Sequence, residues 1–287
     1  MKDIDGVNHV GMAVRDLAAT VAIFERMGFQ LTPYSPQSGA WKPNEAVRSL
    51  GSGNRCIMFA DDYLEVLASE NPKEPSPRIE GFLARHEGAH IVCFNTEEPG
   101  AVDQRLRQDG IETSGVIPLQ REIDTPDGAR TARFERIQFA PGASPEGYIQ
   151  AARHLTPEYI YQPRYIEHAN GCFQLSETIV VVDDLDTYGE RYARYLATQP
   201  VRDGATLRFD LARRTRLTLV PCDAAAAILP RSLFPPLPCI AGVAFRTRAL
   251  EAVRAHLTAQ GFTVTETAGR LVVPAEEASG LAIVFEN

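Results

Sequence analysis

The sequence predicts an α+β fold in which one βαβββ module occurs four times. Each copy begins with a short apolar strand that is followed by a stretch with helical periodicity. In three copies the helix ends at a glycine followed by an apolar residue, as in Gly28-Phe29, Gly110-Ile111 and Gly261-Phe262. After each helix the chain has room for about three short strands. Because one helix covers one face of each strand group, we expect an α+β architecture.

The boundaries of these elements follow from the same periodicities. Asp16 is the expected N-cap of the first helix, and Gly28 is its expected left-handed terminator. The expected first strand and helix of the four copies are 7–14 and 18–27, 90–96 and 99–108, 177–182 and 187–197, and 241–245 and 249–259. The expected last two strands are 55–60 and 63–68, 132–139 and 148–152, 206–211 and 216–221, and 270–273 and 281–285.

The length of 287 residues suits two domains of ordinary size. The likeliest linker is the segment 156–171, whose beginning carries two prolines and has no periodicity. We therefore predict an N-terminal domain over residues 1–155 and a C-terminal domain over residues 172–287, each made of two modules.

Charge and cysteine usage exclude several classes of function. The formal net charge is -8 and there is no basic run, which argues against binding nucleic acid or an anionic membrane. The N-terminus lacks the order of a signal peptide, and no apolar run is long enough to span a bilayer. The five cysteines are scattered and never form a C-x-x-C pair, which favours a reducing cytoplasm. The expected partner is a small-molecule substrate, with a homodimer as a possible assembly.

Polar residues interrupt two strands of the first copy at positions that share one face. Strand alternation places His9 and Glu65 on the face opposite the helix. Aligning the second copy on the first matches His90 with His9, and Gln150 with Glu65. If the two modules form one cup, these four groups converge and could hold a divalent metal ion. A single strand histidine is usually structural, so this hypothesis depends on the equivalence of the positions; Gln150 either binds the metal or orients water or substrate.

The later copies lack this set. Glu177 and Ala241 occupy the places of the two histidines, and the last strands offer no matching ligand. We therefore expect the C-terminal half to be a metal-free copy that braces the first half or closes over its cup.

Further residues are candidates for substrate binding. Asn54 and Arg55 precede a strand and could hold a carboxylate or carbonyl oxygen, the alternative being a turn with a surface arginine. Trp41 lies in a Gly- and Pro-flanked stretch and is either a lid or a core residue. Tyr63 and Tyr148 are expected on the face of the ligands. His154 and His168, which flank the linker, are expected to have structural roles that tie the two halves together.

These motifs resemble those of the vicinal oxygen chelate superfamily and its glyoxalase-like members. The resemblance is carried by the opening phrase Val-Asn-His-Val-Gly-Met-Ala-Val-Arg-Asp-Leu at 7–17 and by the strings 53–55 and 62–65, and it covers residues 5–170. It implies that βαβββ modules pair into two cup-shaped domains. It also implies one divalent metal ion (Zn, Ni, Mn or Fe) in the N-terminal cup, held by His9, Glu65, His90 and Gln150. The family often has glutamate at the last of these places.

The resemblance implies an enzyme, and three functions stay open. The first is a metal-dependent lyase or isomerase whose substrate chelates the metal through neighbouring oxygens, with Glu65 as metal ligand or as catalytic base. The second is a non-haem Fe(II) dioxygenase of the extradiol type that uses His9, His90 and Glu65 as a facial triad. The third is a metal-free protein that binds a small molecule.

Overall fold

The computed structural model describes residues 3–40, 42–71 and 73–287, so Trp41, which we expected to be either a lid or a core residue, lies outside the described residues. Within these ranges all four modules are present in the expected order. The first two modules consist of β1 (Gly6–Ala13), α1 (Leu17–Arg26), β2 (Ser35–Gly39), β3 (Arg48–Met58) and β4 (Tyr63–Ser69), and of β5 (Gly88–Asn95), α3 (Pro99–Gln108), β6 (Ile117–Thr125), β7 (Gly128–Gln138) and β8 (Tyr148–His154). The last two consist of β9 (Cys172–Val182), α5 (Leu185–Leu196), β10 (Val201–Asp203), β11 (Thr206–Asp210) and β12 (Arg216–Pro221), and of β13 (Cys239–Thr247), α7 (Leu250–Ala259), β14 (Thr265–Thr267), β15 (Arg270–Val273) and β16 (Ala282–Glu286).

Short helices connect the modules. The sequence did not predict α2, which joins the first two modules and contributes to the site described below. The first residue of this helix is Pro77, a position where proline is well tolerated. The connecting helices are α2 (Pro77–Leu83), α4 (Pro157–Ile160) and α6 (Ala225–Ile228), with single 3-10 turns at Pro163–Tyr165, Cys222–Ala224 and Ala275–Glu277.

The predicted ends of the first helix are confirmed. The Asp16 side chain accepts a hydrogen bond from the Ala19 backbone N–H at 2.9 Å, which satisfies a donor that the helix leaves free. Gly28 has φ of 89°, the left-handed conformation that glycine adopts without steric strain. Local sequence signals therefore fix where α1 starts and where the chain turns back toward the sheet.

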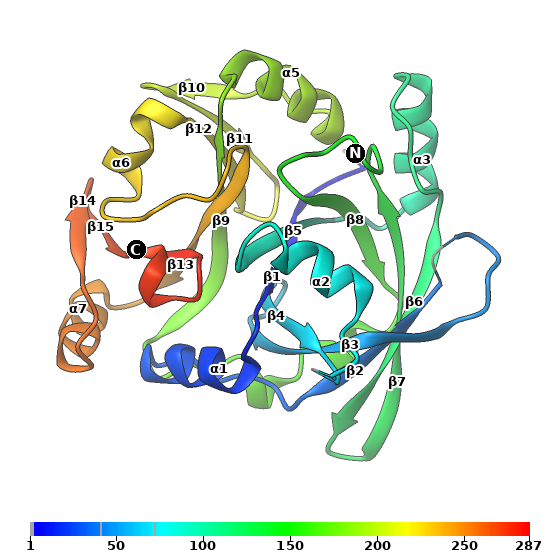
Figure 1. Cartoon of the computed structure of the whole chain (residues 1–287), viewed down its shortest axis with the longest axis horizontal. Helices are drawn as coiled ribbons and strands as arrows, with labels where there is room; N and C mark the ends of the chain where they lie inside the picture. Colours follow the sequence, from blue (N-terminus) through cyan, green and yellow to red (C-terminus); the bar gives the residue numbers. More distant parts are fainter. Residues whose placement is uncertain (1–2, 41, 72) are drawn as a thin grey trace.

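The strands of the first two modules form a closed ring (Figure 1). The strand order is β1-β4-β3-β2-β6-β7-β8-β5, and an antiparallel β1–β5 ladder closes it. In each module the first strand pairs in parallel with the last, as in β1–β4 and β5–β8. The second half has the order β10-β11-β12-β9-β13-β16-β15-β14, and its two end strands are not paired with each other in the described part of the chain.

The two halves share one apolar core. The Phe29 ring from the first half lies 4.9 Å from the Phe245 ring of the second, and Phe59 lies 5.5 Å from the same ring. His168 adds polar contacts, because its Nδ1 accepts the Gln30 backbone N–H at 3.1 Å and its Nε2 lies 2.9 Å from the Met58 carbonyl. His168 therefore has the structural role expected for it. None of the helices in the described residues is long and apolar enough to cross a membrane.

Gly280 marks a close approach between the two halves and gives a test of the shared packing. Its φ is +85°, and a Cβ there would lie 2.0 Å from the Glu87 carbonyl oxygen. Gly269 has a similar φ of +72°, but a Cβ there would meet nothing within 4 Å. We expect Gly269→Ala to lower the free energy of unfolding by about 1–2 kcal/mol through backbone strain, and Gly280→Ala to lower it by at least about 1 kcal/mol more through the clash. Urea unfolding measures both; equal losses would contradict the close approach.

Candidate functional site

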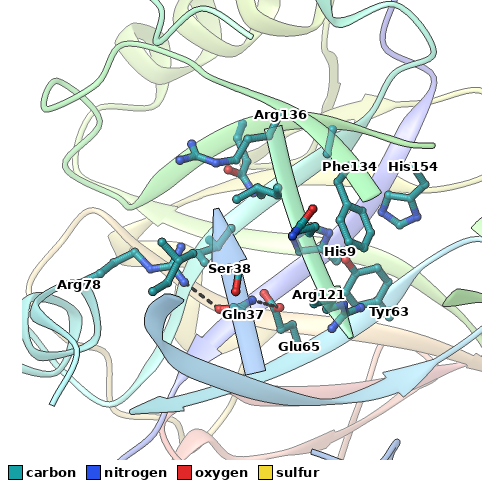
Figure 2. Close-up of a pocket in the computed structure, with 16 residues that line it drawn as sticks. His9, Gln37, Ser38, Tyr63, Glu65, Arg78, Arg121, Phe134, Arg136 and His154 are labelled. Atoms are coloured by element: carbon teal, nitrogen blue, oxygen red, sulfur yellow. Dashed lines mark hydrogen bonds between the residues drawn. The ribbon is translucent and has the colours of Figure 1, made fainter. Parts of the chain in front are cut away.

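A cavity lies inside the closed ring of the N-terminal half and is lined by polar and apolar side chains (Figure 2). Its wall is made by strands from both modules and by α2. The residues that line it are His9, Gln37, Ser38, Leu50, Tyr63, Glu65, Arg78, Ile91, Leu119, Gln120, Arg121, Phe134, Arg136, Gln150, Ala152 and His154.

Strand alternation explains which side chains reach the cavity. Tyr63 and Glu65 are two residues apart on β4, and Phe134 and Arg136 are two apart on β7. Successive side chains of a strand point to opposite faces, so such pairs enter the ring together. The sequence prediction that His9, Glu65 and Tyr63 share one face is met, and the His9 and Tyr63 rings are stacked 4.5 Å apart.

Among the described residues that line the cavity, Glu65 alone carries a carboxylate, and its two oxygens differ in their hydrogen bonds. Oε1 accepts hydrogen bonds from the Gln37 amide at 2.9 Å and from the Asn54 amide. Oε2 accepts no hydrogen bond from any described residue. One oxygen is thus fixed by neutral donors, and the other is free to interact with a ligand.

Asn54 connects Glu65 to a buried arginine. Its side chain is fully buried, donates to Glu65 and accepts from Arg121 Nη1 at 2.7 Å. Asn54 does not line the cavity, so it positions Glu65 and Arg121 instead of binding substrate as we expected. The unit Arg121–Asn54–Glu65 carries one positive and one negative charge and is neutral as a whole.

Two further arginines line the cavity without a carboxylate partner. Arg78 comes from α2 and Arg136 from β7, and neither forms an ion pair with a described acidic residue. Arg136 is 4% exposed, and its Nη1 is buried with no hydrogen-bond partner in the described structure. Burial lowers the pKa of Arg78, Glu65 opposes this, and the nearby Arg136 lowers it further. Counting Glu65 and the three guanidinium groups, the cavity has a surplus of two positive charges.

The C-terminal half contains buried arginines of its own but neutralises them. Arg216 lies 3.0 Å from Glu177 and 2.6 Å from Glu286, and Arg270 contacts both glutamates as well. Burial raises the pKa of Glu177, but Arg270 and Arg216 outweigh it and leave that pKa below its ordinary value. Glu177 holds the place of His9 in the repeat, so the second half fills with ion pairs the region that the first half leaves as a cavity.

His9 is held in one neutral form by its neighbours. Burial lowers its pKa well below the usual value, and His154 and Arg121 add to the effect. The Asn8 amide nitrogen donates to Asn95, so the Asn8 carbonyl oxygen must be the atom that faces His9 Nδ1 at 2.7 Å. Nδ1 therefore carries the proton and Nε2 is an acceptor.

His154 lies in an aromatic wall at the other side of the cavity. Its ring centroid is 4.9 Å from Phe134, 5.4 Å from Tyr161 and 6.1 Å from Tyr63. Both ring nitrogens are buried without a hydrogen-bond partner among the described residues. Burial lowers the pKa of His154 to about 3, with a further contribution from Arg121. His154 thus packs against aromatic rings, in line with the structural role predicted for it, and it also lines the cavity.

His90 does not meet His9 as predicted. The β1–β5 ladder pairs Gly11 with Ile91 and then Met12 with Ala89, which leaves His90 at an irregularity of the register. Ile91, and not His90, lines the cavity. The His90 ring is stacked 4.8 Å from Phe82 of α2, and its Nε2 lies 3.0 Å from the His86 carbonyl. The alignment of the two copies was therefore displaced by one residue at this strand.

The residues present do not fit the divalent metal site that the resemblance implied. No three His, Cys, Asp or Glu side chains in the described part of the chain lie close enough together to hold a metal ion. His9 offers a free nitrogen and Glu65 a free oxygen, but the second predicted imidazole, that of His90, lies outside the cavity, and Gln150 is a neutral amide. Three neighbouring guanidinium groups also oppose the binding of a cation.

Two other predicted substrate contacts lie elsewhere. Arg55 donates from Nε to the Thr32 carbonyl at 2.7 Å and lies 3.7 Å from Glu25 of α1, so it faces the helix. Tyr148 packs edge-on against Phe82 and beneath the Arg136 guanidinium, 5.6 Å from its ring centroid, and does not line the cavity. The prediction for Arg55 was therefore wrong. Tyr148 does share the face of Gln150 on β8, as expected, but it is not among the residues that line the cavity.

Arg78, Arg121, Arg136 and Gln37 were missed. A signal existed for Arg136, because the predicted strand 132–139 alternates Ala132, Phe134 and Arg136 on its apolar face. Arg121 lies on a strand without a clear pattern, and Arg78 lies on a helix that the sequence did not predict.

Comparisons with known proteins agree with this architecture. A family model described as "Glyoxalase-like domain" matches residues 7–196. A hypothetical protein from Staphylococcus aureus is similar in structure, with a TM-score of 0.66, 12% identity and 99% coverage of both chains. A mutant of 4-hydroxymandelate synthase from Streptomyces coelicolor gives 0.60 and 12%, over 99% of this chain and 92% of the other. A fusion of a xylose isomerase-like TIM barrel with 4-hydroxyphenylpyruvate dioxygenase gives 0.55 and 13%, over 99% of this chain and 49% of that one. No curated protein matches the sequence significantly.

The low pKa of His154 predicts acid destabilisation. Between pH 6.5 and about 3 the unfolded chain protonates this histidine while the folded protein keeps it neutral, so stability falls as the pH falls. At pH 5 the loss from this residue is about 2 kcal/mol of unfolding free energy. We expect His154→Phe to reduce the difference between pH 7.5 and pH 5 by this amount in urea unfolding. His256→Phe on α7, outside the cavity, is the control; the same pH dependence in wild type and His154→Phe would contradict the prediction.

Proposed function

Because this chain belongs to the glyoxalase-like domain family of the vicinal oxygen chelate superfamily, we propose that it is a lyase or isomerase that binds a small organic anion without a metal ion. The observation that carries the proposal is the surplus of positive charge in the N-terminal cavity, where three guanidinium groups accompany the single carboxylate of Glu65. Such a cavity attracts an anion and stabilises negative charge that develops on it.

Glu65 is the group proposed to move a proton. Its free oxygen, Oε2, takes the proton from a carbon next to the ligand's carbonyl group, and the electron pair moves to that carbonyl oxygen as an enolate. The positive charge of the surrounding arginines favours the enolate. Oε1 stays fixed by Gln37 and Asn54, so the carboxylate does not have to reorganise during the transfer. In an α-hydroxycarbonyl ligand, isomerisation is complete when the proton returns to the former carbonyl carbon and the hydroxyl proton moves to the enolate oxygen, so that the hydroxyl oxygen becomes the new carbonyl.

The other functions weighed from the sequence have less support. A facial triad of His9, His90 and Glu65 needs His90 in the cavity, where Ile91 is found instead. A binding protein without catalysis is compatible with the charge but gives no use for the free oxygen of Glu65. These alternatives differ in measurable ways.

Proton exchange tests the role of Glu65. In D2O we expect the protein to accelerate the exchange of protons next to the carbonyl of 2-oxobutyrate or dihydroxyacetone phosphate, as followed by NMR. Glu65→Gln should lower the rate at least a hundredfold, since an amide cannot accept the proton, while ligand binding persists. Glu70→Gln, at the exposed end of the same strand region, is the control and should keep the wild-type rate. Binding without exchange in the wild-type protein would support a binding protein instead.

The response to metal ions tests the second part of the proposal. We expect 2-oxobutyrate to raise the melting temperature because it binds the folded state. Zn²⁺, Ni²⁺, Mn²⁺ and Fe²⁺ added singly, the last without oxygen, should leave it unchanged. A specific, stoichiometric stabilisation by one of these ions that is lost in His9→Ala would restore the metal-dependent enzyme and overturn this proposal.

A further inference from the structure

Arg78 and Arg136 carry the charge that the protein leaves uncompensated. Arg121 is matched by Glu65 through the Asn54 side chain. The remaining pair of guanidinium groups has no acidic partner within the described residues, although the two lie close enough to affect each other's charge. Bringing two like charges together in a buried place is unfavourable unless an anion completes the site.

Each arginine of this pair also has a buried donor atom that lacks a hydrogen-bond partner among the described residues. Arg78 donates from Nη2 to the Gln37 amide oxygen at 3.0 Å, but its Nε is buried without a partner, as is Arg136 Nη1. Figure 2 shows Arg78 on one side of the cavity and Phe134 and His154 on the other, with Gln37 and Glu65 between them and the Arg136 guanidinium on the side of Arg78. Donor atoms without a partner therefore belong to the same two arginines that carry the surplus charge.

We propose that Arg78 and Arg136 form a subsite for a doubly charged oxyanion group of the ligand, of which a phosphate monoester is the compact form. The proposal rests on the proposed function and specifies the ligand class. A phosphate monoester carries a charge of about -1.5 to -2 at pH 7, which matches the surplus. It also offers three acceptor oxygens to guanidinium groups that bind such oxygens in a planar, two-pronged way.

The remainder of the ligand extends from this subsite past Glu65. An attached carbon chain would pass Glu65 Oε2 and end against the stacked rings of His9 and Tyr63 and the Phe134 side chain. The neutral His9 Nε2 on that side accepts a hydrogen bond from a hydroxyl group of the ligand. A small phosphorylated compound with a carbonyl or hydroxyl group near its other end meets all of these features.

Two ligands of the same shape but different charge test the subsite. Phenyl phosphate is largely dianionic at pH 7.5, whereas phenyl sulfate has the same tetrahedral group with one charge. By isothermal titration calorimetry we expect phenyl phosphate to bind at least tenfold tighter. In Arg136→Gln the ratio should fall to about two or less, and Arg136→Lys should keep part of it. Arg133→Gln, an exposed arginine on the same strand, should retain the wild-type ratio.

The outcomes separate this inference from the proposed function. Equal affinity of the two ligands in the wild-type protein, or a phosphate preference that survives in Arg136→Gln, would overturn the phosphate subsite. Tighter binding of malonate than of phenyl phosphate would assign the pair to two carboxylates and also overturn it. If 2-oxobutyrate still binds in these cases, the proposed function stands. If none of these anions binds, both the function and the subsite fail.

Discussion

Closure of the N-terminal ring by the β1–β5 ladder is the constraint on which the site depends. A closed ring has an inside, and the two-residue period of each strand then decides which side chains enter it. Many groups in the cavity, such as Tyr63 and Glu65 on β4 and Gln150, Ala152 and His154 on β8, are there because of their parity along a strand. The register irregularity at His90 matters for the same reason. A shift of one residue at the closing ladder exchanges an imidazole for the Ile91 side chain at the cavity wall.

The two halves place the same charged residue types in two different ways. In the C-terminal half Glu177 and Glu286 neutralise Arg216 and Arg270, so the ion pairs fill the space between the strands. In the N-terminal half Glu65 accepts from the Gln37 and Asn54 amides, Arg121 donates to Asn54, and Arg78 and Arg136 form no ion pair with a described acidic residue. A buried charge without a partner lowers the stability of the folded protein much more than a buried ion pair does. The unpaired arginines of the first half are therefore better explained by ligand binding than by stability.

Most of the fold could be predicted from the sequence because each module repeats strong local signals. The apolar strand, the Asp16 cap and the Gly28 terminator act over a few residues, and the structure confirms them. The family was predicted from the same stretch, and the match over residues 7–196 confirms it. The site was harder, because it depends on register and on contacts between distant residues. His9, Glu65 and Gln150 do line the cavity, but one residue of displacement at His90 could not be seen in a linear alignment.

The residues that the sequence did not predict are also those that change the chemistry. With His90 in the cavity, two imidazoles and a carboxylate would favour a divalent cation. With His90 held against Phe82, and with Arg78, Arg121 and Arg136 in the wall, the same cavity favours an anion. In both arrangements positive charge stands beside a ligand oxygen and lowers the free energy of an enolate. Under the proposed function, fixed guanidinium groups provide in this ring the electrostatic stabilisation that a metal ion can provide, and Oε2 of Glu65 is left to accept a proton.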